Sequence, residues 1–421
     1  MWKKTIILWL LAVLFSDFVF ADTGSDEKIL TLGVSGTFTG ALASVGEHVS
    51  NGMTDYLNWT ANHGGIEFKD PESGKNKRIR IKVISEDNQY NAVKSAMAYA
   101  RLKSRGVRAI IGFGSTPGEA CAALASRDKI PYLSWYAYAS PAGFRPSPQY
   151  YWTFLPTIAE AATPMIKWFV KKKWHGQGQP KIGIISLNLP SWRVLEKPGL
   201  TDAYVESIGG RLAGIEFISP RATDISLPLT RLVFEKNADC LILMGVLSQA
   251  VLLAKEMRRM GIDPEKVIVI CNISAWDESI FKSVPKAVEG FHGEVHTVSL
   301  DKDVPGMRKI KKIAKWAGRT SEELLLNYAN GCLGALVLET AIKRALEKNG
   351  YEKVIQSGEM IRNELHHFRA FNPSELAPSI EVRNSDKPFF LNYARIVKAK
   401  NGKFVDAGDW ISVDEIKGTL E

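Results

Sequence analysis

Two adjacent hydroxyl side chains follow a short apolar segment and precede a predicted helix. Ser115 and Thr116 come directly after Gly114, and the helix is expected to begin at Glu119. Hydroxyl groups and the free backbone N–H groups of a helix N-terminus both favour a negatively charged group. The pattern therefore predicts that this turn binds the anionic end of a small molecule; the alternative is a simple N-cap for the helix.

A run of aromatic side chains follows the next apolar segment. Trp135, Tyr136 and Tyr138 surround Ala137 just after a predicted strand. These rings are expected to form one wall of a binding site, and ordinary packing within a loop is the alternative. Further along the chain, Trp192 is either a ring that stacks on a ligand or a core residue beside a hinge.

Motifs of common enzymes and metal sites are absent from the sequence. Gly33, Gly36 and Gly40 do not follow the GxGxxG order of a dinucleotide-binding loop, and no GxSxG nucleophile turn occurs. His292 and His296 lie in a predicted strand, where a spacing of four residues does not produce the convergence that a helix would. We therefore expect no enzymatic activity, no metal and no cofactor.

Cysteine is sparse, and no two cysteines have the CxxC spacing of a metal or redox site. We expect four buried free thiols, because free cysteine packs as a small hydrophobic residue. A disulfide is the alternative, with three possible pairings among which the spacing does not choose. The four residues are Cys121, Cys240, Cys271 and Cys332.

Short apolar runs alternate with helical patterns twice along the chain, which predicts an α/β fold of two doubly wound parallel-sheet lobes. In the first half the predicted strands are residues 29–34, 79–84, 109–111 and 131–134, and in the second half 181–186, 211–217, 239–244 and 267–271. Residues 323–348 are expected to form a long helix that could cross between lobes. Residues 390–410 are expected to form a hairpin that turns at Asn401 and Gly402.

Ligands of doubly wound sheets bind beyond the carboxyl ends of the strands. This rule selects loops from both halves of the chain, which would enclose a ligand if the two lobes face each other. The selected loops are residues 39–46, 86–91, 112–118, 134–141, 187–193, 245–249 and 271–275.

The first residues have the three parts of an export signal: Lys3 and Lys4, an apolar core, and a small-residue cleavage site that ends at Ala21. We expect cleavage there and a periplasmic protein without a lipid anchor. The formal charge of the 421-residue chain is +9. The basic residues are spread along helices and loops, so we expect no binding to nucleic acid.

Several motifs, in order, resemble the leucine/isoleucine/valine-binding branch of the type I periplasmic solute-binding proteins. They are residues 39–43 with 46, 51–52, 86–91, 110–115, 130–134, 289–291, 328–331 and 401–404 with 409–411. The resemblance implies two lobes joined by a three-strand hinge, which close around a small solute and deliver it to the membrane permease of an ABC importer. It also implies a signal peptide at 1–21, lobe one at 28–157 with 296–387, and lobe two at 158–295 with 388–421, in a monomer.

The resemblance carries a set of candidate ligand-binding residues. They are Val45, Gly114, Ser115, Thr116, Ala137 and Tyr138 in lobe one, and Glu160, Trp192, Val246 and Asn272 in lobe two. In amino-acid-binding members, carboxylates and a tyrosine on the second lobe hold the ammonium group of the ligand. Here Glu160 lies about two positions out of register, and the other positions are occupied by Trp192, Val246 and Asn272.

The missing carboxylates bear on the class of ligand. An ammonium group in a desolvated site without a carboxylate would be costly. We therefore expect an amino-acid-like solute or a small, possibly aromatic, carboxylate or amide. An ordinary α-amino acid is disfavoured, although a one-gap shift that aligned Glu160 would restore it. The alternative function is a periplasmic ligand sensor that docks on a receptor, because the same fold serves both roles.

Overall fold

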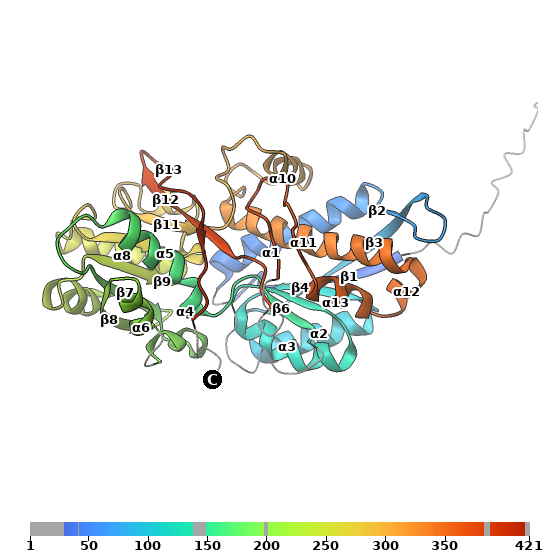
Figure 1. Cartoon of the computed structure of the whole chain (residues 1–421), viewed down its shortest axis with the longest axis horizontal. Helices are drawn as coiled ribbons and strands as arrows, with labels where there is room; N and C mark the ends of the chain where they lie inside the picture. The colour runs from blue at the N-terminus through green and yellow to red at the C-terminus, as the bar shows by residue number, and fades with distance from the viewer. Residues whose placement is uncertain (1–28, 41, 138–148, 198–200, 383–387, 417–421) are drawn as a thin grey trace, which may run out of the picture.

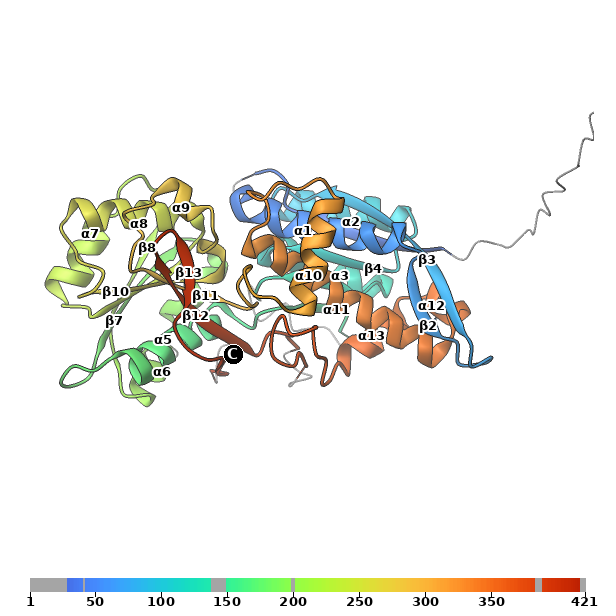
Figure 2. The same ribbon diagram turned by 90° about the horizontal axis from the view of Figure 1, so that it is seen from above.

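A computed structural model describes residues 29–40, 42–137, 149–197, 201–382 and 388–416. The predicted signal peptide and Tyr138 lie outside these residues. Two β-sheets, each covered by helices, lie side by side as two lobes (Figures 1 and 2). The prediction of an α/β fold with two lobes is confirmed, and the exact lobe boundaries stay a prediction.

Lobe one contains a six-stranded sheet in the order β2-β3-β1-β4-β5-β6. Its pairs are parallel except for the antiparallel β2–β3 pair at one edge. The central strands β1 and β4 have almost only buried residues, as expected for parallel strands covered on both faces. The strands are β1 Ile29–Gly36, β2 Ile66–Lys69, β3 Asn76–Asp87, β4 Ala109–Phe113, β5 Tyr132–Trp135 and β6 Tyr151–Thr153.

The helices of lobe one cover both faces of this sheet. In Figure 1, α2 and α3 lie on one side of the strands, while α1 and α11 lie on the other. The long helix predicted at residues 323–348 is α11, and it packs on α1 within lobe one instead of crossing between the lobes. The helices are α1 Ala43–Asn62, α2 Ala92–Ser104, α3 Ser115–Asp128, α10 Pro305–Trp316, α11 Leu326–Asn349, α12 Tyr351–Gln356 and α13 Glu359–His366.

Lobe two contains the second sheet, in the order β13-β12-β11-β10-β9-β7-β8, with β14 paired to β12. Strands β7 to β11 are parallel to one another, whereas β12 and β13 form an antiparallel hairpin. The predicted turn at Asn401 and Gly402 is confirmed, with both residues at positive φ. The strands are β7 Lys181–Leu187, β8 Arg211–Ile218, β9 Cys240–Met244, β10 Ile268–Cys271, β11 His292–Val295, β12 Tyr393–Lys400, β13 Lys403–Asp406 and β14 Ile411–Ser412.

Most helices of lobe two are short. The longest is α8, and α5 continues into a π-helical turn, η2, that ends in three consecutive lysines. The helical segments are α4 Ile158–Ala161, α5 Thr163–Trp168, η2 Phe169–Lys173, η3 Pro190–Glu196, α6 Thr201–Ser207, α7 Ser226–Leu229, η4 Thr230–Glu235, α8 Leu247–Arg259, η5 Ile273–Ala275 and α9 Ile280–Ser283. All four cysteines are buried free thiols, as predicted.

Hydrogen bonds tie together the segments that connect the lobes. Leu391 donates its backbone N–H to the carbonyl of Phe154 at 2.8 Å, beside an isolated bridge between Thr153 and Phe389. In the connecting segment that follows β11, Nδ1 of His296 lies 2.8 Å from the carbonyl oxygen of Tyr393. These bonds hold the connecting segments side by side, an arrangement suited to a hinge.

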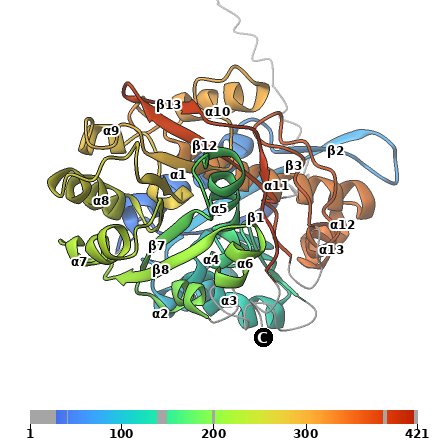
Figure 3. The ribbon, with the colours of Figure 1, turned by 60° about the vertical axis from the view of Figure 1, so that its left-hand side comes forward.

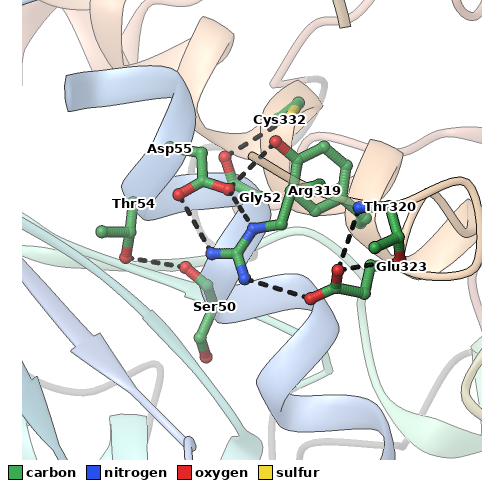
Figure 4. Close-up of polar contacts among 9 residues, drawn as sticks. Ser50, Gly52, Thr54, Asp55, Arg319, Thr320, Glu323 and Cys332 are labelled. Carbon is green, nitrogen blue, oxygen red and sulfur yellow. Dashed lines mark hydrogen bonds and ion pairs between the residues drawn. The ribbon is translucent and has the colours of Figure 1, made fainter. Parts of the chain in front are cut away.

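A polar cluster joins α1 to the loop between α10 and α11 (Figure 4). Arg319 donates two hydrogen bonds to the carboxylate of Asp55, at 2.7 and 3.1 Å. The hydroxyl of Tyr328 donates a third bond to the same carboxylate at 3.1 Å. Because Asp55 is only 7% exposed, its charge depends on these partners.

Two glycines let α1 and α11 cross at very short range. A Cβ atom on Gly331 would lie 2.0 Å from the carbonyl oxygen of Val49, and one on Gly52 would lie 2.1 Å from that of Tyr328. Both glycines belong to motifs that were assigned to the family resemblance. Glycine is required at both positions because the backbones of the two helices approach each other closely.

We expect Gly331→Ala to lower the free energy of unfolding by about 2–3 kcal/mol, because the backbones must separate. The gain in helix propensity, about 1 kcal/mol, offsets only part of this loss. Urea unfolding measures the change. Gly334→Ala, one turn further along α11, is the matched control, since its Cβ would meet only side-chain atoms, the nearest at 3.2 Å. Equal stability of the two variants would contradict this account of the helix crossing.

Candidate functional site

Side chains near the carboxyl ends of the strands of both sheets meet at the boundary between the lobes. Across this boundary, Nδ2 of Asn272 donates to the hydroxyl of Tyr136 at 2.8 Å, and the rings of Tyr136 and Trp192 lie 5.8 Å apart. We call this group the interlobe site. It consists of Ser115 and Tyr136 from lobe one and Trp192, Asn272 and Glu294 from lobe two.

The turn from β4 into α3 presents an unused hydroxyl. Gly114, at φ 107°, is the N-cap residue, and α3 begins at Ser115, earlier than the predicted start at Glu119. The Ser115 side chain is fully buried, makes no capping bond, and has no hydrogen-bond partner among the described residues. The N-cap alternative is therefore wrong for Ser115, whose hydroxyl is available to an additional group.

A tyrosine that sequence reasoning missed covers this turn. The hydroxyl of Tyr90 forms hydrogen bonds with the backbone of Ser115 and the side chain of Thr116, and burial raises its pKa. A Cβ atom on Gly114 would lie 2.6 Å from the ring of Tyr90, so only glycine fits beneath it. Thr116 is exposed. The signal for Tyr90 was its place in the predicted ligand loop at residues 86–91.

Tyr136 and Trp192 bring aromatic surface to the site from opposite lobes. Tyr136 is 4% exposed, Trp192 is 1% exposed, and Nε1 of Trp192 has no hydrogen-bond partner in the described part of the chain. Burial raises the pKa of Tyr136. The contact between the rings places Trp192 at the lobe boundary, which supports its predicted role as a stacking residue. The neighbouring Ala137 is fully buried.

Asn272 spans the boundary between the lobes with both ends of its amide. Its Oδ1 accepts the N–H of Gly245 at 2.9 Å, and its Nδ2 donates to Tyr136. Val246 is 3% exposed at the N-terminus of α8, and Val45 is 1% exposed in the first turn of α1. The predicted ligand-binding roles of the two valines stay predictions.

Glu160 lies at the first crossing into lobe two and serves as a helix cap. It forms a capping box with Thr157, whose N–H and hydroxyl donate to Oε2 at 3.0 and 2.9 Å. The backbone N–H of Ile416 donates to Oε1 at 2.9 Å. Both carboxylate oxygens are thus engaged by the chain itself, and a role for Glu160 at the ligand stays a prediction.

The structure supplies a carboxylate that is not among the candidate residues selected from the sequence. Glu294, on β11, is fully buried, and neither of its carboxylate oxygens has a hydrogen-bond partner within the described ranges. Its negative charge contributes to the raised pKa of Tyr136, which places it beside the interlobe site. A buried carboxylate without a donor is costly, so this position favours an additional hydrogen-bond donor or cation.

The nearest charged or titratable partner of Glu294 is a histidine. Nε2 of His296 lies 3.4 Å from its Oε1. Since Nδ1 of His296 faces the carbonyl of Tyr393, Nδ1 must carry a proton. In the neutral imidazole, Nε2 would then be an acceptor facing another acceptor. A hydrogen-bond donor from a bound molecule would satisfy the carboxylate of Glu294.

Two acidic residues of lobe two also bind the N-terminus of α11 in lobe one. Glu278 accepts the backbone N–H of Leu326 at 2.9 Å, and Asp277 accepts a bond from Nδ2 of Asn327 at 2.8 Å. Burial, with a smaller contribution from the charge of Asp277, raises the pKa of Glu278 to about 8. The folded structure therefore favours the protonated form of Glu278.

This shift predicts a pH dependence of stability. The ordinary pKa of glutamate is 4.5, so the folded chain retains a proton on Glu278 that the unfolded chain releases between pH 4.5 and 8. The stabilisation is complete below pH 4.5 and is lost as the pH rises through 8. In melting curves from pH 5 to 9, we expect Glu278→Gln to lose less stability than the unmodified protein. Glu322→Gln, at an exposed position, is the control; an unchanged slope in Glu278→Gln would contradict the shift.

Two further properties of the described residues bear on function. None of the helices there is long and apolar enough to cross a membrane. No group of three or more histidine, cysteine, aspartate or glutamate side chains in those ranges could hold a metal ion.

Comparison with known proteins places the fold. A model of the family described as "Periplasmic binding protein" matches residues 30–386. A branched-chain amino acid ABC transporter protein from Thermus thermophilus with bound valine has a TM-score of 0.75 and 18% sequence identity, over 94% of this chain and 98% of that one. No curated protein matches the sequence significantly.

Other similar structures differ in the ligands named with them. A fatty acid ABC transporter substrate-binding protein from Thermomonospora curvata has a TM-score of 0.69 and 20% identity, over 93% and 94% of the two chains. A solute-binding protein of an ABC transporter from Rhodopseudomonas palustris BisB5, in complex with 3,4-dihydroxybenzoic acid, has a TM-score of 0.70 and 16% identity, over 93% and 99%. At these low sequence identities, the structural similarity shows that the proteins share a fold.

Proposed function

The chain belongs to the periplasmic binding protein family, and on this premise we propose that it captures a small solute between its two lobes and delivers it to an ABC importer. The observation that supports this most directly is the interlobe site, where Tyr136 of lobe one bonds Asn272 of lobe two. Closure of two lobes around a ligand is a hinge motion that a membrane partner can recognise. Similar structures come from proteins of ABC transporters, which supports an ABC importer as the partner of this chain.

The side chains of the interlobe site favour a solute with one acceptor end and one donor end. Ser115 and the N-terminus of α3 suit a carboxylate. Glu294 suits an ammonium group, and the rings of Tyr136 and Trp192 suit an apolar body between the two ends. We therefore propose an amino-acid-like ligand.

This proposal narrows the ligand class expected from sequence, which was an amino-acid-like solute or a small carboxylate or amide. The sequence disfavoured an ordinary α-amino acid because the aligned positions of lobe two lack a carboxylate. Glu294 lies on a different strand and supplies one. The buried carboxylate therefore removes the main argument against an ammonium group.

Thermal-shift measurements on refolded residues 22–421 test the function. The compounds are amino acids, aromatic acids, fatty acids and amides. A ligand at about 100 times its Kd adds about 2.7 kcal/mol of stability, which shifts the melting temperature visibly. We expect stabilisation by one of these classes, with amino acids strongest. If none of the four classes stabilises the protein, the proposed capture of such solutes is wrong.

The charge of Glu294 distinguishes the ligand classes. We expect Glu294→Gln to bind an ammonium-bearing ligand about 100-fold more weakly, since the charge-assisted bond at a buried site is lost. Binding of an acid or amide should change much less. Isothermal titration of both variants measures the difference, and equal affinity for an amino acid would exclude Glu294 as its partner.

The compartment and the assembly state are part of the same proposal. We propose removal of the first 21 residues on export and a monomer in the periplasm, in line with the tripartite N-terminus. N-terminal sequencing of the protein recovered from a periplasmic extract tests the cleavage. Recovery of an uncleaved chain from the membrane fraction would contradict it.

A further inference from the structure

A cavity of about 470 Å³ lies in lobe two, and none of its lining residues belongs to the interlobe site. It is bounded by the end of η2 on one side and by the β12–β13 hairpin on the other. Figure 3 shows α5, which leads into η2, beside β12. The lining side chains used below are Trp168, Lys172, Lys173, His292, Lys398 and Lys400.

An imidazole in the wall of this cavity has an unused nitrogen. His292 is 2% exposed, and its Nδ1 has no hydrogen-bond partner among the residues described. Its ring packs against Trp168 with centroids 4.9 Å apart, and Trp168 is fixed by a bond from Nε1 to the carbonyl of Ala407. Burial, then the charges of Lys398 and Lys173, lowers the pKa of His292 to about 4. The ring is neutral at pH 7.

The carboxylates around the cavity are already engaged. Glu265 pairs with Lys398 at 2.8 Å, and both oxygens of Glu289 accept the backbone N–H of Asn401 at 3.1 Å. The third carboxylate, Asp406, pairs with two cations at 2.9 Å each, Lys302 and Arg395. Glu265 and Asp406 are thus balanced by cations, whereas Glu289 keeps its charge and accepts a neutral N–H.

The lysines that line the cavity have fewer partners than its carboxylates. Lys172, Lys173 and Lys400 form no ion pair within the described part of the chain. Among the described residues these ammonium groups have no carboxylate partner, and the buried Nδ1 of His292 has no hydrogen-bond partner there. The cavity thus has spare donors and positive charge, and it lacks a group with several acceptor oxygens.

We propose that this cavity is a second binding site, which takes a phosphate monoester. A phosphate presents several acceptor oxygens and up to two negative charges, which matches the three unpaired ammonium groups. The volume lies within the range of small-molecule sites and exceeds that needed for a phosphate alone. The organic part of the ester would meet the apolar side chains of Trp168 and Val405, which also line the cavity.

Isothermal titration of the mature protein with glycerol 3-phosphate, at low ionic strength, tests the site. We expect saturable binding that Lys173→Gln weakens about tenfold or more. Lys171→Gln is the matched control, because Lys171 belongs to the same lysine run and does not line the cavity. Trp192→Ala should leave this binding unchanged, which separates it from the interlobe site and from the proposed transport function.

A phosphate monoester could be free or part of a lipid, and a second arm distinguishes the sources. Vesicles of phosphatidylcholine with and without phosphatidic acid are compared for binding of the same variants. Lys173-dependent binding to phosphatidic acid vesicles, without binding of glycerol 3-phosphate, supports the site with a lipid as the source. Equal losses in Lys171→Gln and Lys173→Gln would overturn the proposal, since they would indicate general charge attraction. The absence of saturable binding in both arms would overturn it as well.

Discussion

Replacing Asp55 by alanine is expected to lower the free energy of unfolding by about 3 kcal/mol, the largest loss of stability that we predict. The carboxylate of Asp55 accepts three hydrogen bonds, two from Arg319 and one from Tyr328 (Figure 4). Its side chain is 10% exposed and that of Arg319 is 22% exposed. Without Asp55, a guanidinium and a buried tyrosine hydroxyl lose their acceptor while remaining partly desolvated.

Chemical unfolding in urea measures this loss, with Glu323→Gln as the matched control. Glu323 also pairs with Arg319, at 3.5 Å, but its side chain is 42% exposed. We expect the control to change stability by less than about 1 kcal/mol. The double variant Asp55→Ala with Arg319→Met should recover part of the loss, because no unpaired charge then remains. Equal losses in Asp55→Ala and Glu323→Gln would show that burial of the pair is not the cause.

Replacing Trp192 by alanine is expected to weaken capture of the solute by at least about 100-fold, provided that the proposed function is correct. Trp192 is almost fully buried, and its ring faces Tyr136 across the lobe boundary. Truncation removes a large apolar surface from the interlobe site and also loosens the contact between the lobes. Both effects disfavour the closed, ligand-bound arrangement.

Isothermal titration with the solute that most stabilises the unmodified protein measures the affinity. Trp192→Phe should retain most of it, because a ring still packs on Tyr136. Trp174→Ala removes a tryptophan of lobe two whose Nε1 bonds Gly178 and which is not part of the interlobe site, so its affinity should match the unmodified protein. An unchanged affinity in a folded Trp192→Ala protein would assign this residue to the core.

The stability experiment on Asp55 and the binding experiment on Trp192 concern different parts of the molecule. The cluster of Asp55 lies within lobe one, between α1 and the start of α11. Residues more than about 7–10 Å apart usually act additively, so Asp55→Ala should lower stability without changing the contacts of Trp192. Melting temperature and affinity measured on each variant therefore separate folding from recognition.

The sequence alone determined the order of strands and helices and the loops in which the site lies. Hydrophobic periodicity and turn residues act over a few neighbouring positions, so they identify β4 and the hairpin turn at Asn401, although they place the start of α3 four residues too late. The family resemblance singled out Trp192 and Gly331, without giving the structural reason for Gly331.

Which side chains meet depends on contacts between segments that are far apart in the sequence. Glu294 becomes a candidate for the ligand because β11 places it, fully buried, beside Tyr136, about 160 positions earlier in the chain. Glu160 caps α4 through a local capping box with Thr157, but only the tertiary structure brings Ile416, from the far end of the sequence, to its second carboxylate oxygen. Burial and hydrogen-bond partners between distant segments depend on how the chain crosses between the lobes, and no local pattern of residues encodes that crossing.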